Sequence, residues 1–179
     1  MSSVVSRRYA KALIDLATQE GIADQVEKEF GTIVKTVVEN RKLKNFFFNP
    51  VFNNEDKGKL LDMVVDEIRV SGLLKRFLRL LIGKDRFPII REIYREYVRF
   101  ADEIHNRAKA EVTTALPLKE EDKKNLQAKL EALSGKRIYL KVKEDPALIG
   151  GAVTRIGSVV YDGSIKSSMI KLKEQLVKG

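Results

Sequence analysis

Cysteine and tryptophan are absent from this chain of 179 residues, and histidine occurs only once, at position 105. Without cysteine there can be no disulfide framework, no thiol nucleophile and no thiolate metal site. One imidazole cannot build a site of paired histidines, and His105 stands among the charged residues that end a predicted helix. We therefore expect no bound metal, and we interpret His105 as a solvated residue at a helix end.

Long apolar runs and nucleotide-binding glycine motifs are also lacking. No run approaches the roughly 18–20 residues that a membrane-spanning helix needs, and the N-terminus has no apolar signal-peptide core. The glycines fit neither the phosphate-binding loop nor the dinucleotide fingerprint. No pair of carboxylates stands out as a general acid and base. We expect a protein that is not an enzyme, has no catalytic residues and no cofactor, and stays in the cytosol.

Positive charge is what the composition has in excess. Lys and Arg number 34 against 25 Asp and Glu, so the net charge is +9 at pH 7. Most of the excess lies in residues 106–179, which hold 15 basic and 9 acidic residues, a net +6. Such a balance fits either a soluble basic protein with no anionic partner, or a protein that binds nucleic acid, an anionic membrane surface or an acidic protein.

The first hundred residues are predicted to form six helices. Apolar residues recur there at helical spacing, and short polar segments separate the periodic stretches. The expected N-caps are Ser6, Asp24, Asn53 or Asn54, and Ser71. Helices joined by such short connections are typical of a compact bundle, which we place at residues 1–105.

The sequence pattern changes after residue 105. Alternating residues predict strands over 109–116 and 137–143, and helical spacing returns over 119–134. A hairpin at Gly157-Ser158 follows, and Ser164 caps a last helix whose apolar face holds Ile165, Met169, Leu172 and Leu176. The expected fold class is therefore α+β, a six-helix bundle followed by a small mixed α/β domain at residues 106–179.

Two helices of the bundle carry more apolar surface than a single core contact requires. On a helical wheel, the apolar arcs of residues 7–20 and 72–84 are roughly 200° wide, against about 100° for a helix that faces a core on one side. Either both helices lie centrally and bury both sides, or a groove between them is open to an amphipathic partner helix. In the second case Arg76 at the rim would pair with acidic residues of the partner.

The strand predicted at 137–143 has one apolar face and one basic face. Ile138, Leu140 and Val142 alternate with Arg137, Tyr139, Lys141 and Lys143. A basic face of this kind can be solvated, can meet an acidic protein, or can bind RNA by stacking and phosphate contacts. One tyrosine is too few for a stacking platform, which disfavours RNA.

Four segments together resemble one protein family. They are YAKALIDLA at 9–17, LKNFFFNP at 43–50, KDRF at 84–87 followed by Ile93, Tyr94 and Tyr97, and DPALIGGAVTRIG at 145–157 continuing to VYDGS at 160–164. In these segments the chain is similar to the delta subunit of F-type ATP synthases, the family of the oligomycin-sensitivity-conferring protein. The resemblance spans nearly the whole chain, and the Phe46-Phe47-Phe48 run departs from the family's usual pattern.

The resemblance implies a non-catalytic stator component in the peripheral stalk of the proton-translocating ATP synthase. In this family the N-terminal bundle binds the amphipathic N-terminal helix of an alpha subunit, at the top of the catalytic head, between its first and fifth helices. Carried over to this chain, the partner-facing residues are Tyr9, Ala12, Leu16, Arg76 and Leu80, and the core-facing residues are Leu13, Ala17, Phe77 and Leu81. The C-terminal domain is expected to hold the ends of the b subunits, so that the head resists the torque of the rotor.

The resemblance also implies where the protein works. We expect a single copy in a hetero-oligomer, on the cytoplasmic face of a bacterial plasma membrane, attached to the membrane through its partners and without nucleic acid. The alternative is a basic nucleic-acid-binding or membrane-surface module. Nucleic-acid binding would weaken steeply with salt, and a membrane-surface protein would bind anionic vesicles directly.

Overall fold

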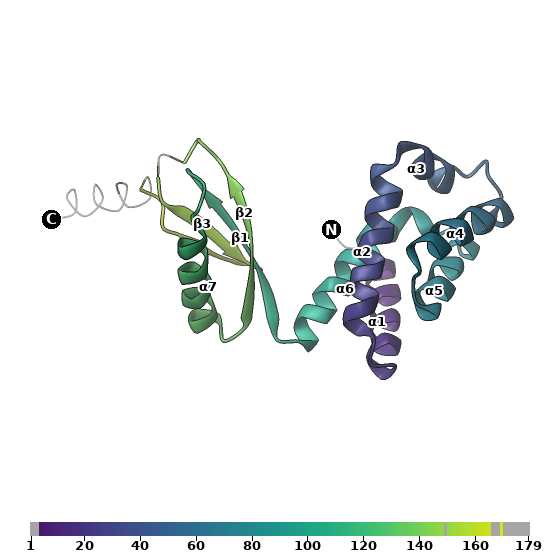
Figure 1. The fold of residues 1–179 in the computed structure, drawn as a ribbon, viewed down its shortest axis with the longest axis horizontal. Coiled ribbons are helices and arrows are strands. Elements are labelled where there is room, and N and C mark those ends of the chain that lie inside the picture. Colours follow the sequence, from purple (N-terminus) through teal and green to yellow (C-terminus); the bar gives the residue numbers. More distant parts are fainter. Residues whose placement is uncertain (1–3, 149, 166–168, 170–179) are drawn as a thin grey trace. The chain divides into compact units, whose positions relative to one another are not determined.

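The structure, a computed structural model, describes residues 4–148, 150–165 and 169. The chain divides into two compact units, Met1–Asp102 and Glu103–Gly179. In Figure 1 the first unit consists of helices, and the second holds a sheet with a helix packed on it. The α+β fold class predicted from the sequence is confirmed. In the described part of the chain, no helix combines the length and the apolar composition that crossing a membrane would require.

The described residues of the bundle form six α-helices and one 3-10 turn. These are α1 (Val4–Gln19), α2 (Ala23–Glu39), α3 (Arg41–Phe48), α4 (Asn54–Ile68), α5 (Gly72–Gly83), the 3-10 turn (Phe87–Ile89) and α6 (Ile90–Ile104). Their apolar faces share one core, in which the fully buried Phe30 ring makes edge contacts with Phe77, Tyr94 and Tyr97. Burial raises the pKa of Tyr97, whose protonated hydroxyl donates to the Ala23 carbonyl at 2.9 Å.

Two predicted caps start their helices as expected. The Asn53 side chain accepts a hydrogen bond from the Asp56 backbone N–H at 2.7 Å, and Ser71 Oγ accepts one from Leu74 at 3.4 Å. The backbone N–H of Ser71 in turn donates to Glu29 Oε2 at 2.7 Å. The start of α5 is thereby tied to α2 as well as capped.

Two other predicted caps are wrong. Ser6 is buried inside α1, which begins before it, and Asp24 lies within the first turn of α2 rather than ahead of it. Gly21, at φ +70°, closes α1 in a turn where the Ile22 N–H donates to the Ala17 carbonyl at 2.9 Å. The turn leads straight into α2 and leaves Ile22 at the N-cap position, and because the isoleucine side chain has no hydrogen-bond acceptor, α2 begins without a side-chain cap.

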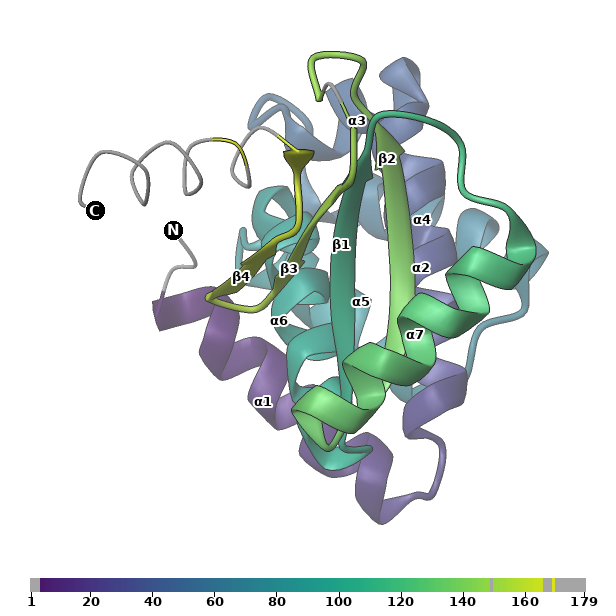
Figure 2. The ribbon, with the colours of Figure 1, turned by 90° about the vertical axis from the view of Figure 1, so that its left-hand side faces the viewer.

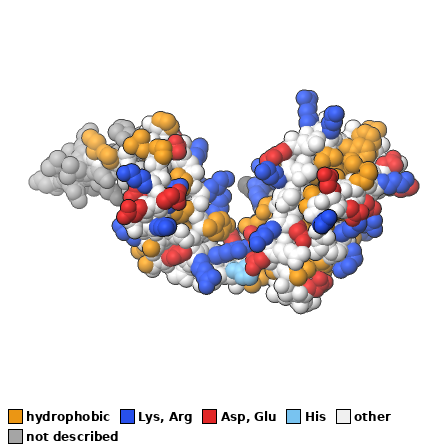
Figure 3. Space-filling model, in the orientation of Figure 1, with side chains coloured by type: hydrophobic (Ala, Val, Ile, Leu, Met, Phe, Trp, Pro, Cys, Tyr) orange, Lys and Arg blue, Asp and Glu red, His pale blue; other side chains and the backbone are white. Residues whose placement is uncertain are grey.

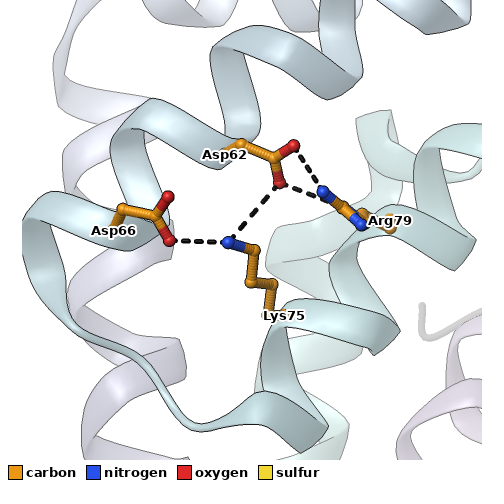
Figure 4. Close-up of polar contacts among 4 residues, drawn as sticks. All are labelled: Asp62, Asp66, Lys75 and Arg79. Carbon is orange, nitrogen blue, oxygen red and sulfur yellow. Dashed lines mark hydrogen bonds and ion pairs between the residues drawn. The ribbon is translucent and has the colours of Figure 1, made fainter.

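A network of ion pairs joins α4 to α5 (Figure 4). Lys75 Nζ lies 2.6 Å from Asp66 Oδ1 and 3.9 Å from Asp62 Oδ1, and Arg79 Nε donates to Asp62 Oδ1 at 3.0 Å. The hydrogen bond from Arg79 and the charges of both cations lower the pKa of Asp62. The network fixes the polar side of α5 against α4 and so orients the rest of that helix.

Asp62→Asn is expected to lower the free energy of unfolding by about 1 kcal/mol at pH 7. Because the folded-state pKa of Asp62 is depressed, its contribution is complete above the ordinary aspartate pKa of about 3.9 and is lost as the pH falls through the lower folded value. The difference in the free energy of unfolding between Asp62→Asn and wild type should therefore become smaller in acid. Urea titrations of both proteins at neutral and acidic pH measure this difference. Glu67→Gln, on the exposed face of the same helix, is the control, and a difference independent of pH would contradict the assignment.

The second unit is a four-stranded mixed sheet with one described helix on it. Its elements are β1 (Arg107–Thr114), α7 (Glu120–Ser134), β2 (Arg137–Glu144), β3 (Ala152–Ile156) and β4 (Val159–Asp162). The strand order is β2-β1-β3-β4, with β1 and β2 parallel and the other neighbours antiparallel (Figure 2). On one face Leu130 of α7 packs with Ala110 and Ile138. The hairpin predicted at Gly157-Ser158 joins β3 to β4, whereas most of the predicted last helix, with Leu172 and Leu176, lies outside the described residues.

A short junction leads from the bundle into the sheet. Asn106, between α6 and β1, has a left-handed backbone at φ 47°. Its carbonyl accepts from the Arg137 N–H at 3.0 Å, and its side-chain amide donates to the Gly135 carbonyl at 3.1 Å. The chain therefore enters the sheet at β1, which has strands on both sides.

Two neighbouring glycines precede β3, in the stretch that carries the family resemblance. Gly151 has φ +83°, and a Cβ added to it would lie 2.3 Å from the carbonyl oxygen of Gly163. Hydrogen bonds close the same contact, from the Gly163 N–H to the Ala152 carbonyl and from the Ile165 N–H to the Gly150 carbonyl, both at 3.0 Å. Glycine is required at 151 because two backbone segments meet there.

Candidate functional site

An open groove of about 500 Å³ runs between α1 and α5 of the bundle. Its lining is mostly apolar and consists of Arg8, Tyr9, Ala12, Leu13, Leu16, Leu73, Arg76, Phe77 and Leu80. The structure thus brings together all five residues predicted to face a partner, namely Tyr9, Ala12, Leu16, Arg76 and Leu80.

The spacing of these residues along each helix explains why they meet. Tyr9, Ala12 and Leu16 recur at helical intervals on α1, and Arg76 and Leu80 are four residues apart on α5. Leu16 and Leu80 are each 48% exposed. Large apolar side chains that stay half exposed on two neighbouring helices leave the groove uncovered, so α1 and α5 do not bury all of their apolar surface.

The floor of the groove belongs to the bundle core. Leu13 and Phe77 are buried and line it, and Ala17 and Leu81 are fully buried, as predicted for the core-facing set. The Tyr9 ring packs edge-on against Phe77, with their centroids 6.4 Å apart. The floor of the groove is therefore part of the packed core of the bundle.

Two arginines stand at the groove. The Arg76 side chain is 72% exposed, and its Nη2 lies 4.0 Å from Glu20 Oε1. Arg8, also exposed, was not among the residues predicted from the sequence, because a charged side chain does not count toward an apolar arc. Its distance of four residues from Ala12 places it on the same side of α1 and could have identified it. Two guanidinium groups beside an apolar floor suit an amphipathic segment with acidic residues along its edges.

The lining of the groove is suited to binding an apolar surface. Its lining includes no carboxylate and no imidazole, and Arg8, Tyr9 and Arg76 are its polar side chains. Across the described ranges, no three His, Cys, Asp or Glu side chains gather closely enough to hold a metal ion. What the lining can do is bury the apolar face of a helix, as helix-in-groove interfaces do.

Comparison with known proteins gives consistent matches over the full length. The sequence model of one family, described as ATP synthase delta (OSCP) subunit, matches residues 5–176. The chain is 34% identical over 178 residues to ATP synthase subunit delta of Geotalea uraniireducens, covering 99% of both chains. It is 38% identical over 180 residues to ATP synthase subunit delta of Desulforapulum autotrophicum, covering 100% of this chain and 98% of that one.

A solved structure has the same fold. One chain of the cryo-EM structure of the Toxoplasma gondii mitochondrial ATP synthase hexamer superposes with a TM-score of 0.75 and covers 98% of each chain. The sequence identity of that pair is 19%, so the likeness is one of fold.

Proposed function

The chain belongs to the ATP synthase delta (OSCP) subunit family, and from that premise we propose that it is a non-catalytic stator component of a proton-translocating F-type ATP synthase. It ties the N-terminal helix of an alpha subunit, at the top of the catalytic head, to the b subunits of the peripheral stalk. The head would otherwise turn with the rotor. The subunit holds it still so that torque is used for ATP synthesis.

The groove between α1 and α5 is the observation that carries this proposal. Leu16 and Leu80 offer apolar surface on its two sides, and Leu13 and Phe77 give it a packed floor. An amphipathic helix laid along it would cover both leucines and remove their apolar area from water. Acidic residues of that helix would meet Arg76 at the rim.

Two separate units suit a linking role. The first unit presents the groove, and the second unit, with its own sheet and core, is available to the b subunits. Binding at two linked sites raises the overall affinity without new contacts at either one. The subunit is thereby held on the cytoplasmic face of a bacterial plasma membrane by its partners, in one copy per complex.

Calorimetry of the full chain with a synthetic N-terminal segment of the cognate alpha subunit tests the proposal. We expect tight one-to-one binding that changes little with moderate salt, because the contact is mainly apolar. The matched control is the same segment with its apolar face replaced by serine. No binding by a chain that circular dichroism shows to be folded would contradict the proposal.

The net charge of +9 is also consistent with one alternative, a basic module that binds nucleic acid or membranes. On the face of the molecule drawn in Figure 3, however, acidic side chains are interspersed among the basic ones over both units. Titration with duplex DNA and with anionic vesicles tests this alternative. Binding to DNA that falls steeply with salt would favour it.

A further inference from the structure

The second unit has a sheet face that α7 does not cover. Side chains alternate across a strand, so the residues between those that pack on α7 point to the opposite face. Register places Glu111 beside Lys141 of β2 and beside Arg155 of β3, and Arg155 beside Val160 of β4. All four are exposed. We call this surface the open face and define it as these four residues with Lys109, Tyr139 and Lys143 and with Asp162 of β4, which pairs with Val153 of β3.

The open face is positively charged even though it holds two carboxylates, Glu111 and Asp162. Lys109 Nζ is 2.6 Å from Glu111 Oε1, and Lys141 and Arg155 flank the same carboxylate from the neighbouring strands. The hydrogen bond from Lys109 and the charges of all three cations lower the pKa of Glu111. Glu111 and Asp162 can balance two of the four cations Lys109, Lys141, Lys143 and Arg155, so the open face keeps a net positive charge.

We propose that the open face binds an acidic segment of a partner protein, and specifically the acidic stretch by which a b subunit would contact this unit. This inference rests on the proposed function, because that function names the b subunits as partners of the second unit. Charge complementarity selects the occupant, since a carboxylate-bearing helix or strand that crosses β2, β1 and β3 would meet Lys141, Lys109 and Arg155 in that order.

The make-up of the open face favours protein over nucleic acid. Tyr139 is its only aromatic side chain, whereas sheets that bind RNA stack two or three bases on aromatic residues. Glu111, in the middle strand pair, would repel a phosphate backbone. Val160 and Tyr139 are 49% and 38% exposed, and they supply the apolar contacts that protein interfaces combine with charge.

Titration of the full chain with the soluble segment of the cognate b subunit tests this inference. The double variant K141E/R155E reverses two charges of the open face and is expected to bind at least about tenfold more weakly. The control K124E/K129E reverses two exposed charges on α7 and changes the net charge equally, yet should bind as wild type does. Glu111→Gln removes one of the two opposing carboxylates and should tighten binding a few-fold. A folding defect would not produce such a gain.

The outcomes separate this inference from the proposed function. Equal affinity of wild type and K141E/R155E would overturn the open face as the contact and leave binding of the b subunit in place. A wild-type chain that binds the alpha segment and not the b segment would overturn both this inference and the stalk half of the proposed function. Stronger binding to duplex DNA or anionic vesicles than to the b segment, lost in K141E/R155E, would assign the face to phosphate groups and overturn the protein partner.

Discussion

Leu80→Asp is expected to weaken binding of the alpha-subunit helix by at least about 100-fold, because a carboxylate would be buried against the apolar face of the partner. Leu80 is 48% exposed in the free chain, on the side of α5 that lines the groove. The substitution should therefore cost little stability while it removes the apolar contact. Calorimetric titration with the alpha segment gives the ratio of the two affinities.

Met63→Asp is the matched control for that experiment. Met63 lies on α4, is 63% exposed and does not line the groove, so the same charge is added to the same unit without touching the proposed site. Its affinity for the alpha segment should equal that of wild type, and both variants should still bind the b segment. Unchanged affinity in the Leu80 variant would show that the helix binds elsewhere.

Gly151→Ala is expected to destabilise the second unit by roughly 3 kcal/mol and to leave the bundle folded. The backbone of Gly151 has φ +83°, and the added Cβ would lie 2.3 Å from the Gly163 carbonyl oxygen. The atoms nearest the added Cβ are backbone atoms of Gly163 and Ser164, which cannot move aside as a flexible side chain could. Because each unit has a core of its own, hydrogen exchange should report loss of protection in residues 107–162 with little change in the bundle.

Gly58→Ala is the control for the loss of stability expected of Gly151→Ala. It replaces a glycine at a position where an added Cβ has room. Gly58 lies in the interior of α4, and a Cβ there would meet nothing within 4 Å. Alanine is the better helix former, so this variant should gain roughly 0.5–1 kcal/mol in the bundle. If Gly151→Ala unfolded like wild type in a denaturant titration, the close backbone contact at Gly151 would not be essential.

Local sequence patterns predicted most of the helices and strands. They did not predict which distant strands pair with one another. Asn53 and Ser71 were recognised as caps because a side-chain oxygen reaches backbone N–H groups only two or three residues away. Asp24 is not the cap of α2, because the turn at Gly21 starts that helix earlier and leaves Ile22 at the N-cap position. The order β2-β1-β3-β4 depends on which distant strands pair, and no spacing within one strand encodes that choice.

The candidate site was likewise predictable within each helix but not between the two helices. Spacing alone places Tyr9, Ala12 and Leu16 on one side of α1, and the wide apolar arcs indicated that α1 and α5 have surface to spare. That these two helices are neighbours came from the family resemblance, since packing between separate helices is not written in the periodicity of either one. Binding of the alpha helix to these residues remains a prediction until the titrations are done.

If the chain carries load in the proposed stator role, the junction at Asn106 has a mechanical consequence. Tension passing through the backbone out of α6 enters the sheet at Arg107, at one end of a strand that is hydrogen-bonded along both edges. When the pull is directed along β1, the bonds to β2 and β3 are strained in shear, all at once, instead of opening one by one like a zipper. The second unit would then yield only at a force that breaks many bonds together, which suits a tether that must transmit torque without unravelling.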